Sequence, residues 1–146
     1  MFHTILAPTD GSPLSEKAVD AAIELAKQLQ GKIVTISVAE PAPFVALSEG
    51  GAIPGDLEAY EEKAMQVAQH RVQKVAAAAS AANVPCEALA VLSFSPYEEI
   101  IRAADDYKCD VIFMASHGRR GLTKLFLGSE TQKVLAHSTI PVLVYR

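Results

Sequence analysis

The chain has 146 residues, of which half are hydrophobic and 21% are charged, the composition of one soluble globular domain spanning residues 1–146. Its formal net charge of −4 argues against a general affinity for nucleic acids or anionic membranes, since either partner requires a basic surface. No apolar run approaches the roughly 18 residues of a membrane span, and the first residues lack the pattern of a signal peptide. Cys86 and Cys109 lack the spacing of a metal or redox pair, so we expect buried thiols in a reducing cytoplasm.

Short β-branched runs alternate along the chain with longer stretches of helical periodicity. The runs are predicted strands because none shows the two-residue alternation of a half-exposed strand. They comprise residues 2–8, 32–38, 86–92, 110–115 and 140–145. The stretches between them predict helices that begin after Ser12, at residue 56, at residue 95 and near Gly128. The pattern βαβαβαβαβ predicts an α/β domain with a parallel sheet, right-handed crossovers and helices on both faces.

The residues at the ends of these segments predict helix caps. Ser12 is a candidate N-cap and Pro13 suits the first helical position, whereas Gly31 is expected to end the first helix. Ser95 and Glu98 form a predicted capping box at the start of the third helix. The residues expected to face the core are Ala18, Ala22, Leu25, Ala26 and Leu29 in the first helix, Ala64, Ala68, Val72, Val75 and Ala79 in the second, and Tyr97, Ile100, Ile101 and Ala104 in the third.

Ligands of open α/β sheets bind beyond the carboxyl ends of the strands, so the loops there are the first candidates for a site. After the first strand, Asp10 and Ser12 are candidates whose alternative role is that of ordinary turn and cap residues. The loop resembles that of dehalogenase-type phosphatases, but Pro8 stands where the nucleophilic aspartate would be. A receiver-type phosphoacceptor domain fails as well, because Ser93 and Phe94 stand where it needs a further aspartate.

Residues 39–55 form a long irregular connection rich in proline and glycine. Loops of this length in compact domains are usually functional or mobile. We therefore predict a lid, with plain disorder as the alternative.

Residues 114–132 combine glycines, bases and hydroxyls directly after a predicted strand. Gly118 and Gly128 lack a Cβ, which lets the backbone bend and lets an anion approach its N–H groups. Ser129 and Thr131 add hydroxyl donors at the start of a helix, whose free amides and dipole favour negative charge. From residue 116 to residue 133, four bases oppose the single acid Glu130, a balance of +3; the bases are Arg119, Arg120, Lys124 and Lys133. The segment predicts a phosphate cradle, and the alternative is an ordinary capping box of Ser129 and Gln132.

Other anion-binding and nucleic-acid motifs fit the chain less well. The sequence GRRG at residues 118–121 matches the GxxG loop with which KH domains clamp RNA, but a KH domain is smaller and orders its elements differently. Neither GxGxxG nor GxxxxGK[ST] follows the first strand, so the usual dinucleotide and P-loop sites are absent from the sequence.

The spacing Ala115-x2-Gly118-x9-Gly128-Ser129 resembles the G-x2-G-x9-G-[S/T] signature of ATP-binding universal stress proteins. The resemblance covers the chain from "ILAPTDGS" to "PVLVYR". The chain departs from the family at two places, since Ala115 replaces the first glycine of the signature and Phe94 replaces a frequent glycine before the third helix. The resemblance implies a Rossmann-like, adenine nucleotide alpha hydrolase-like domain with the strand order 3-2-1-4-5.

Carried onto this sequence, the resemblance implies a complete nucleotide site. Pro8, Thr9 and Asp10 would lie along the adenosine, with Asp10 near the ribose, and Val38 would pack on the adenine. The residues around the triphosphate would be Ala115, Gly118, Gly128, Ser129, Glu130 and Thr131, largely through backbone N–H groups. Mg²⁺ would bridge phosphate oxygens, because it keeps several waters and needs few protein ligands.

The resemblance also implies a homodimer in which the last strands of two copies pair. The expected function is that of a cytoplasmic ATP-binding stress-response protein whose nucleotide is a regulatory or structural ligand. One alternative is a dimeric interaction module that has lost ATP, and another is a slow ATPase or nucleotidyl transferase. His117 is expected to pack or to form a hydrogen bond rather than to catalyse, because no carboxylate beside it in the sequence would orient it.

Overall fold

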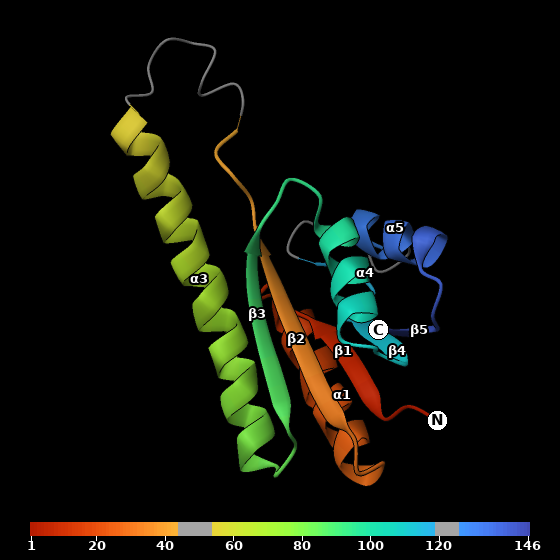
Figure 1. The fold of residues 1–146 in the computed structure, drawn as a ribbon. Coiled ribbons are helices and arrows are strands. Elements are labelled where there is room, and N and C mark those ends of the chain that lie inside the picture. The colour runs from red at the N-terminus through yellow and green to blue at the C-terminus, as the bar shows by residue number, and fades with distance from the viewer. Residues whose placement is uncertain (44–53, 119–125) are drawn as a thin grey trace.

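Parallel strands form one twisted sheet through the middle of the molecule (Figure 1). The structure is a computed structural model that describes residues 1–43, 54–118 and 126–146. Within these residues the strands are β1 (Thr4–Pro8), β2 (Lys32–Ala39), β3 (Cys86–Leu92), β4 (Val111–Ala115) and β5 (Val142–Tyr145). Their order is β3-β2-β1-β4-β5, which confirms the predicted single α/β domain and its Rossmann-like topology.

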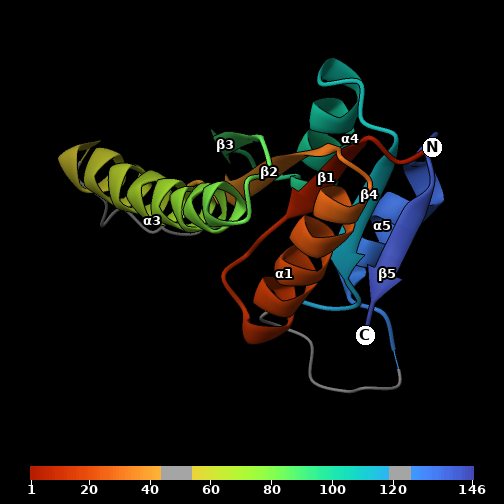
Figure 2. The same ribbon diagram turned by 90° about the horizontal axis from the view of Figure 1, so that it is seen from below.

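Helices cover both faces of the sheet, two on each face among the described residues (Figure 2). They are α1 (Pro13–Gln28) and α3 (Pro54–Ala81) on one face, and α4 (Pro96–Asp106) and α5 (Ser129–His137) on the other. The core is divided accordingly. Ile5, Ile33 and Val111 pack against α1 and α3, whereas the alternate residues Leu6, Val34 and Ile112 pack against α4 and α5. Because the strands are buried on both faces, they read as continuous apolar runs in the sequence.

The N-terminus of α1 agrees with the predicted cap, whereas its C-terminus does not. Ser12 Oγ accepts the Ser15 N–H at 3.2 Å, so the predicted N-cap is confirmed. At the other end, Gln30 rather than Gly31 takes the left-handed conformation, with φ 54°. Gly31 is required for another reason, because a Cβ at this position would collide with the carbonyl oxygen of His3. The core-facing residues also differ in part, since Leu29 is 42% exposed while Ser15, Val19 and Ile23 join Ala18, Ala22 and Ala26 inside.

The long helix α3 packs on β2 and β3 through its second half. Ala68, Val72, Val75 and Ala79 are buried as predicted, and Ala64 is half-buried. The first turns of α3 rise beyond the carboxyl ends of β2 and β3 (Figure 1). This overhang brings exposed side chains of α3 to the edge of the sheet where the strands end.

The capping box predicted for α4 is wrong. Ser95 is the N-cap residue, but its side chain forms no capping hydrogen bond. Instead, Glu130 of α5 accepts the Tyr97 N–H through Oε2 at 2.9 Å. A residue 33 positions away thus accepts the hydrogen bond of an amide in the first turn. No local sequence pattern predicts this contact. On the face that packs on the sheet, Ile100, Ala103 and Ala104 are buried, whereas Tyr97 and Ile101 are only half-buried.

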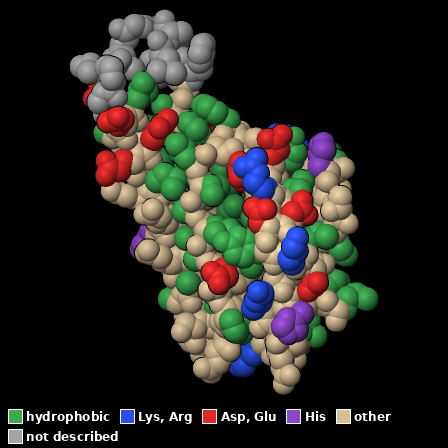
Figure 3. All heavy atoms as spheres, viewed as in Figure 1, with side chains coloured by type: hydrophobic (Ala, Val, Ile, Leu, Met, Phe, Trp, Pro, Cys, Tyr) green, Lys and Arg blue, Asp and Glu red, His purple; other side chains and the backbone are tan. Residues whose placement is uncertain are grey.

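The sheet keeps an apolar surface beside α4. Leu89 and Val91 of β3 are half-buried, and Leu92 is 39% exposed. Figure 3 shows hydrophobic side chains gathered between α3 and α4 on this face. Phe94, at the position where the sequence departs from the family, is 71% exposed in the loop that follows.

Both cysteines are free thiols, with Cys109 buried as predicted and Cys86 half-buried. Burial raises the pKa of each thiol to about 11, which favours the protonated thiol at neutral pH. No helix within residues 1–43, 54–118 and 126–146 is long and apolar enough to span a membrane.

Candidate functional site

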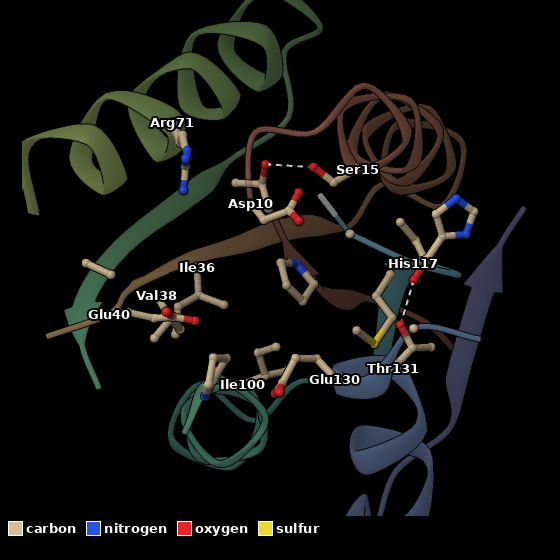
Figure 4. A pocket seen from close by; sticks show the side chains of 18 of the residues that line it. Asp10, Ser15, Ile36, Val38, Glu40, Arg71, Ile100, His117, Glu130 and Thr131 are labelled. Carbon is tan, nitrogen blue, oxygen red and sulfur yellow. Dashed lines mark hydrogen bonds between the residues drawn. The ribbon is translucent and has the colours of Figure 1, made fainter. Parts of the chain in front are cut away.

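A cavity of about 1050 Å³ opens at the carboxyl ends of β1, β2 and β4, between the overhanging part of α3 and the start of α5 (Figure 4). Its position agrees with the rule that ligands of open α/β sheets bind where the strand order reverses. The residues that the resemblance assigns to the nucleotide site all line it, namely Pro8, Thr9, Asp10, Val38, Ala115, Gly118, Gly128, Ser129, Glu130 and Thr131. Three loops that are distant in the sequence are therefore brought to one place.

The turn after β1 is held by its own side chains. Thr9 N–H donates to the Ile36 carbonyl at 2.9 Å, which ties the turn to β2. Thr9 Oγ1 lies 3.2 Å from Ser15 Oγ in α1 and accepts the Gly11 N–H. Asp10 Oδ1 accepts the Ser12 N–H at 2.9 Å. Asp10 and Ser12 are thus turn and cap residues, which was the alternative role considered from the sequence. Asp10 also lines the cavity.

Gly118 brings the loop after β4 against this turn. A Cβ on Gly118 would collide with Oδ2 of Asp10. The two oxygens of Asp10 therefore face different loops, since Oδ1 binds its own turn. The absence of a side chain at residue 118 lets the β1 and β4 loops meet in the cavity wall.

Gly128 is required for close packing rather than for bending. Its φ of −61° and ψ of 154° are accessible to any residue, so the predicted conformational role is wrong. A Cβ there would lie 2.9 Å from the Cα of His117. Gly128 N–H donates to the Ser116 carbonyl at 2.7 Å, and this bond joins the start of α5 to the end of β4.

The first turn of α5 presents backbone amides at the cavity. Gln132 N–H donates to the Gly128 carbonyl at 3.0 Å and is the first amide bonded within the helix, so those of Ser129, Glu130 and Thr131 precede the helical ladder. The alternative of a Ser129 and Gln132 capping box is wrong, because Gly128 is the N-cap and the Gln132 side chain donates through Nε2 to the Leu127 carbonyl. These first-turn amides and the helix dipole make this end of the cavity favourable for an anion.

The side chains of this turn are used for structure. Thr131 Oγ1 is buried and donates to the Ala115 carbonyl at 3.0 Å, so its hydroxyl does not point into the cavity as a donor, contrary to the prediction. The Glu130 carboxylate binds the Tyr97 N–H and lies 3.1 Å from Lys133 Nζ. Lys133 therefore neutralises Glu130 and stands over the Tyr97 ring, 5.6 Å from its centroid. Of the hydroxyls in this turn, that of Ser129 remains exposed.

Apolar side chains form part of the cavity lining. Ile36 and Val38 come from β2, Met114 from β4 and Ile100 from α4. Val38 is half-buried and packs on the core between the sheet and α4. A flat apolar group of a ligand has its natural contact here, whereas an anionic group has its contacts at α5.

His117 forms a hydrogen bond, as expected from the sequence. Its Nδ1 lies 3.1 Å from Ser116 Oγ, and its ring turns away from the centre of the cavity (Figure 4). Among the described residues, no three His, Cys, Asp or Glu side chains gather as ligands for a metal ion. The bases Arg119, Arg120 and Lys124 of the predicted cradle, and residues 44–53 of the predicted lid, lie outside the described residues.

Reasoning from the sequence missed the contribution of α3. Tyr60, Lys63, Val67 and Arg71 line the cavity from this helix. Arg71 reaches from α3 toward the turn that holds Asp10 (Figure 4). Charged residues on the solvent side of an amphipathic helix carry no motif, so the one available signal was the spacing of residues 63, 67 and 71, which places them on one stripe.

Comparison with known proteins gives a consistent result over the whole chain. The model of the universal stress protein family matches residues 1–146. The universal stress protein MJ0531 of Methanocaldococcus jannaschii is 32% identical over 146 residues, which cover 100% of this chain and 83% of that protein. A universal stress protein of Thermus aquaticus is 34% identical over the full length of both chains. The solved structure of the protein MJ0577 superposes with a TM-score of 0.81 at 25% identity, over 99% of this chain and 96% of that one.

Proposed function

The chain belongs to the universal stress protein family, and from this premise we propose that it is a cytoplasmic stress-response protein that binds ATP in the cavity as a regulatory or structural ligand. The observation that carries the proposal is the polarity of the cavity. One end offers the first-turn amides of α5, and part of the lining is apolar, formed by Ile36, Val38 and Met114. A phosphate chain and an adenine ring require these two environments.

The proposed pose follows the order of the residues in the cavity. The adenine would lie against Val38, the ribose beside Asp10, and the phosphates at Gly118, Gly128 and the amides of Ser129, Glu130 and Thr131. Mg²⁺ would bridge the phosphate oxygens and keep its other ligands as water, since the described residues offer no cluster of acidic side chains for it. The chemistry that it supplies is the neutralisation of phosphate charge.

The alanine at the first signature position is compatible with this proposal. Ala115 is only 7% exposed and belongs to the core cluster shared with Ala22, Ile23 and Ala26 of α1. Its carbonyl is bound by the Thr131 hydroxyl. The methyl group is therefore packed on the α1 side of the sheet, away from the amides of α5, and this supports binding despite the missing glycine.

Structures of the same fold provide further support. A universal stress protein solved in complex with cAMP superposes with a TM-score of 0.71, and one from Archaeoglobus fulgidus in complex with dAMP with a TM-score of 0.63. At 23% and 17% identity these two establish the fold alone. The nucleotides in these two structures are the reason for proposing an adenine nucleotide as the ligand of this chain.

We expect ATP to be held rather than turned over. Hydrolysis needs a group that orients or activates water and donors that bind more strongly in the transition state. Asp10 is engaged with its own turn, and the ring of His117 turns away from the cavity. Sustained release of phosphate under saturating ATP and Mg²⁺, lost in Asp10→Asn, would favour the ATPase alternative instead.

The proposal includes a homodimer formed through β5. This strand is an edge of the sheet, and its residues Val142, Leu143, Val144 and Tyr145 are all half-buried apolar side chains. Apolar edge strands pair with other chains unless they are covered. Sedimentation of the purified protein as a monomer at micromolar concentration would contradict this part of the proposal.

The test of ATP binding uses two substitutions of one residue. Ser129→Ala removes the hydroxyl, whereas Ser129→Pro also removes the backbone N–H at the first position of α5. Proline is well tolerated at this position, and the extended conformation of Gly128 suits the residue before a proline. ATP at about 100 times its dissociation constant should stabilise the wild type by roughly 2.7 kcal/mol.

Ser129→Ala should retain most of the ATP affinity, while Ser129→Pro should lose about tenfold, the effect of one hydrogen bond to a charged group. Thermal melting and titration calorimetry with Mg²⁺ and ATP measure both. Equal affinities in the two variants would show that the amides of α5 are not the phosphate site. A wild type that neither copurifies with nucleotide nor binds ATP would favour the interaction module without nucleotide.

A further inference from the structure

Glu130 extends from the first turn of α5 toward α4 (Figure 4). Its carboxylate accepts the Tyr97 N–H through Oε2 at 2.9 Å, and Oε1 lies 3.1 Å from Lys133 Nζ. Glu130 also lines the cavity, together with Gly128 and Ser129. The carboxylate is therefore held in the cavity wall through both of its oxygens.

This carboxylate lies close to the position proposed for the phosphates. The backbone N–H of Glu130 is one of the first-turn amides of α5 at the cavity. The carboxylate cannot lie farther from that amide than the reach of its own side chain. A phosphate bound at the first-turn amides is therefore within the range at which like charges repel each other, even near a protein surface.

Lys133 offsets the charge of Glu130 from outside the cavity. The Lys133 side chain is 50% exposed, compared with 35% for Glu130, and it is not among the described residues that line the cavity. Solvent and salt screen an exposed ammonium group. A phosphate in the cavity therefore meets the carboxylate more directly than it meets the ammonium group.

The other charges in the cavity lining do not reverse this balance. Among the described lining residues, the acids are Asp10, Glu40 and Glu130 and the bases are Lys63 and Arg71, which gives −1. The described lining thus offers no excess of positive charge against a long phosphate chain. The attraction for phosphate comes from the backbone amides and the dipole of α5.

The N-terminus of α5 attracts the Glu130 carboxylate for the same reason that it attracts a phosphate. An acidic side chain in the first turn is stabilised by the helix dipole, and Glu130 is the acid of this turn. A second helix end takes part, because the Tyr97 N–H belongs to the first turn of α4, where Ser95 provides no side-chain cap. The protein's own carboxylate therefore uses part of the positive potential of both helix ends before a ligand enters.

We propose that Glu130 is a specificity-determining residue that selects nucleotides by the charge of their phosphate chain, favouring chains that carry few charges or are neutralised by Mg²⁺. The inference rests on the proposed function, which places the phosphates at the amides of α5. The backbone N–H of Glu130 attracts the phosphate chain, whereas its carboxylate opposes each further uncompensated charge.

Titration calorimetry of the wild type and Glu130→Gln with adenosine, AMP and ATP tests this assignment. Glutamine keeps an oxygen that accepts the Tyr97 N–H and removes the charge. In the presence of EDTA, Glu130→Gln should bind ATP about fivefold more tightly than the wild type, as expected of one relieved like-charge contact. The gain should be smaller for AMP and absent for adenosine, and Mg²⁺ should reduce the gain for ATP.

Glu98→Gln is the matched control. Glu98 is an exposed acid in the first turn of α4 and is not among the described residues that line the cavity. The substitution removes the same charge near the same helix end, so it should leave the affinity for ATP unchanged. Thermal melting without ligand verifies that both variants are folded.

Three results would overturn the inference and leave the proposed function intact. In the first, Glu130→Gln binds ATP as tightly as the wild type or more weakly, so the carboxylate does not oppose the phosphates. In the second, Glu130→Gln binds adenosine more tightly by the same factor, so the gain does not arise from phosphate charge. In the third, Glu98→Gln gives an equal gain, so only the net charge of the chain matters. If the wild type binds none of the nucleotides, the proposed function fails and the inference fails with it.

Discussion

The two sides of the cavity are built in different ways. The α5 side, formed by residues 115–118 and 126–131, uses backbone groups packed against each other, with Gly128 against His117 and the Thr131 hydroxyl on the Ala115 carbonyl. The α3 side uses exposed side chains on a helix that overhangs the sheet. A wall made of backbone tolerates few substitutions, whereas a wall made of side chains changes its chemistry without disturbing the fold. The α5 side therefore depends on close backbone packing, and the α3 side on side chains at the surface.

The strongest test of this contrast is Gly128→Val, paired with Val67→Ala on the α3 side. The new side chain at residue 128 meets the backbone of His117, which cannot move without the end of β4. We expect a loss of about 3 kcal/mol in the free energy of unfolding, the upper range for overpacking. Val67 is 42% exposed, so Val67→Ala should stay within about 0.5 kcal/mol. Urea denaturation measures both, and equal losses would mean that the two sides are built alike.

A smaller effect is expected from Thr131→Val, which keeps the shape of the side chain. The change removes the donor that binds the buried Ala115 carbonyl at 3.0 Å. Loss of a partner for a buried acceptor costs about 1–3 kcal/mol. Thr131→Ser keeps the hydroxyl and is the control, so it should recover most of the lost stability in the same denaturation experiment. If valine and serine behave alike, packing of the methyl group, and not the hydrogen bond, secures the start of α5.

The smallest effect should come from Lys74→Met on the α3 side. Lys74 and Glu16 form an ion pair at 2.7 Å, but their side chains are 64% and 47% exposed. Exposed ion pairs contribute between zero and about 1 kcal/mol and are weakened by salt. We expect a loss of at most about 0.5 kcal/mol at low salt that disappears in about 1 M sodium chloride. A larger loss that persists in salt would mean that α3 is anchored to α1 by this pair.

The sequence by itself determined the features that are encoded within short windows. Apolar runs and helical periods predicted every strand and helix described, because burial on both faces and amphipathic packing leave their period in the chain. Ser12 caps α1 because a hydroxyl reaches an amide three residues away. The glycine and hydroxyl pattern located part of the cavity lining, namely Gly118, Gly128, Ser129 and Thr131, since parallel strands end at one edge of the sheet. Pro8, Val38 and Ala115 were named through the family resemblance.

Only the tertiary structure decided which groups those residues use and what surrounds them. Glu130 caps α4 across 33 residues, Gly31 makes room for the carbonyl of His3, and Arg71 lies on Gly11. Each contact joins segments that are far apart in the chain, so no local pattern specifies it. The Thr131 hydroxyl points to Ala115 and not into the cavity for the same reason, because a buried carbonyl at the end of β4 requires a donor. A residue type indicates what a side chain can do, and the packing around it determines what it does.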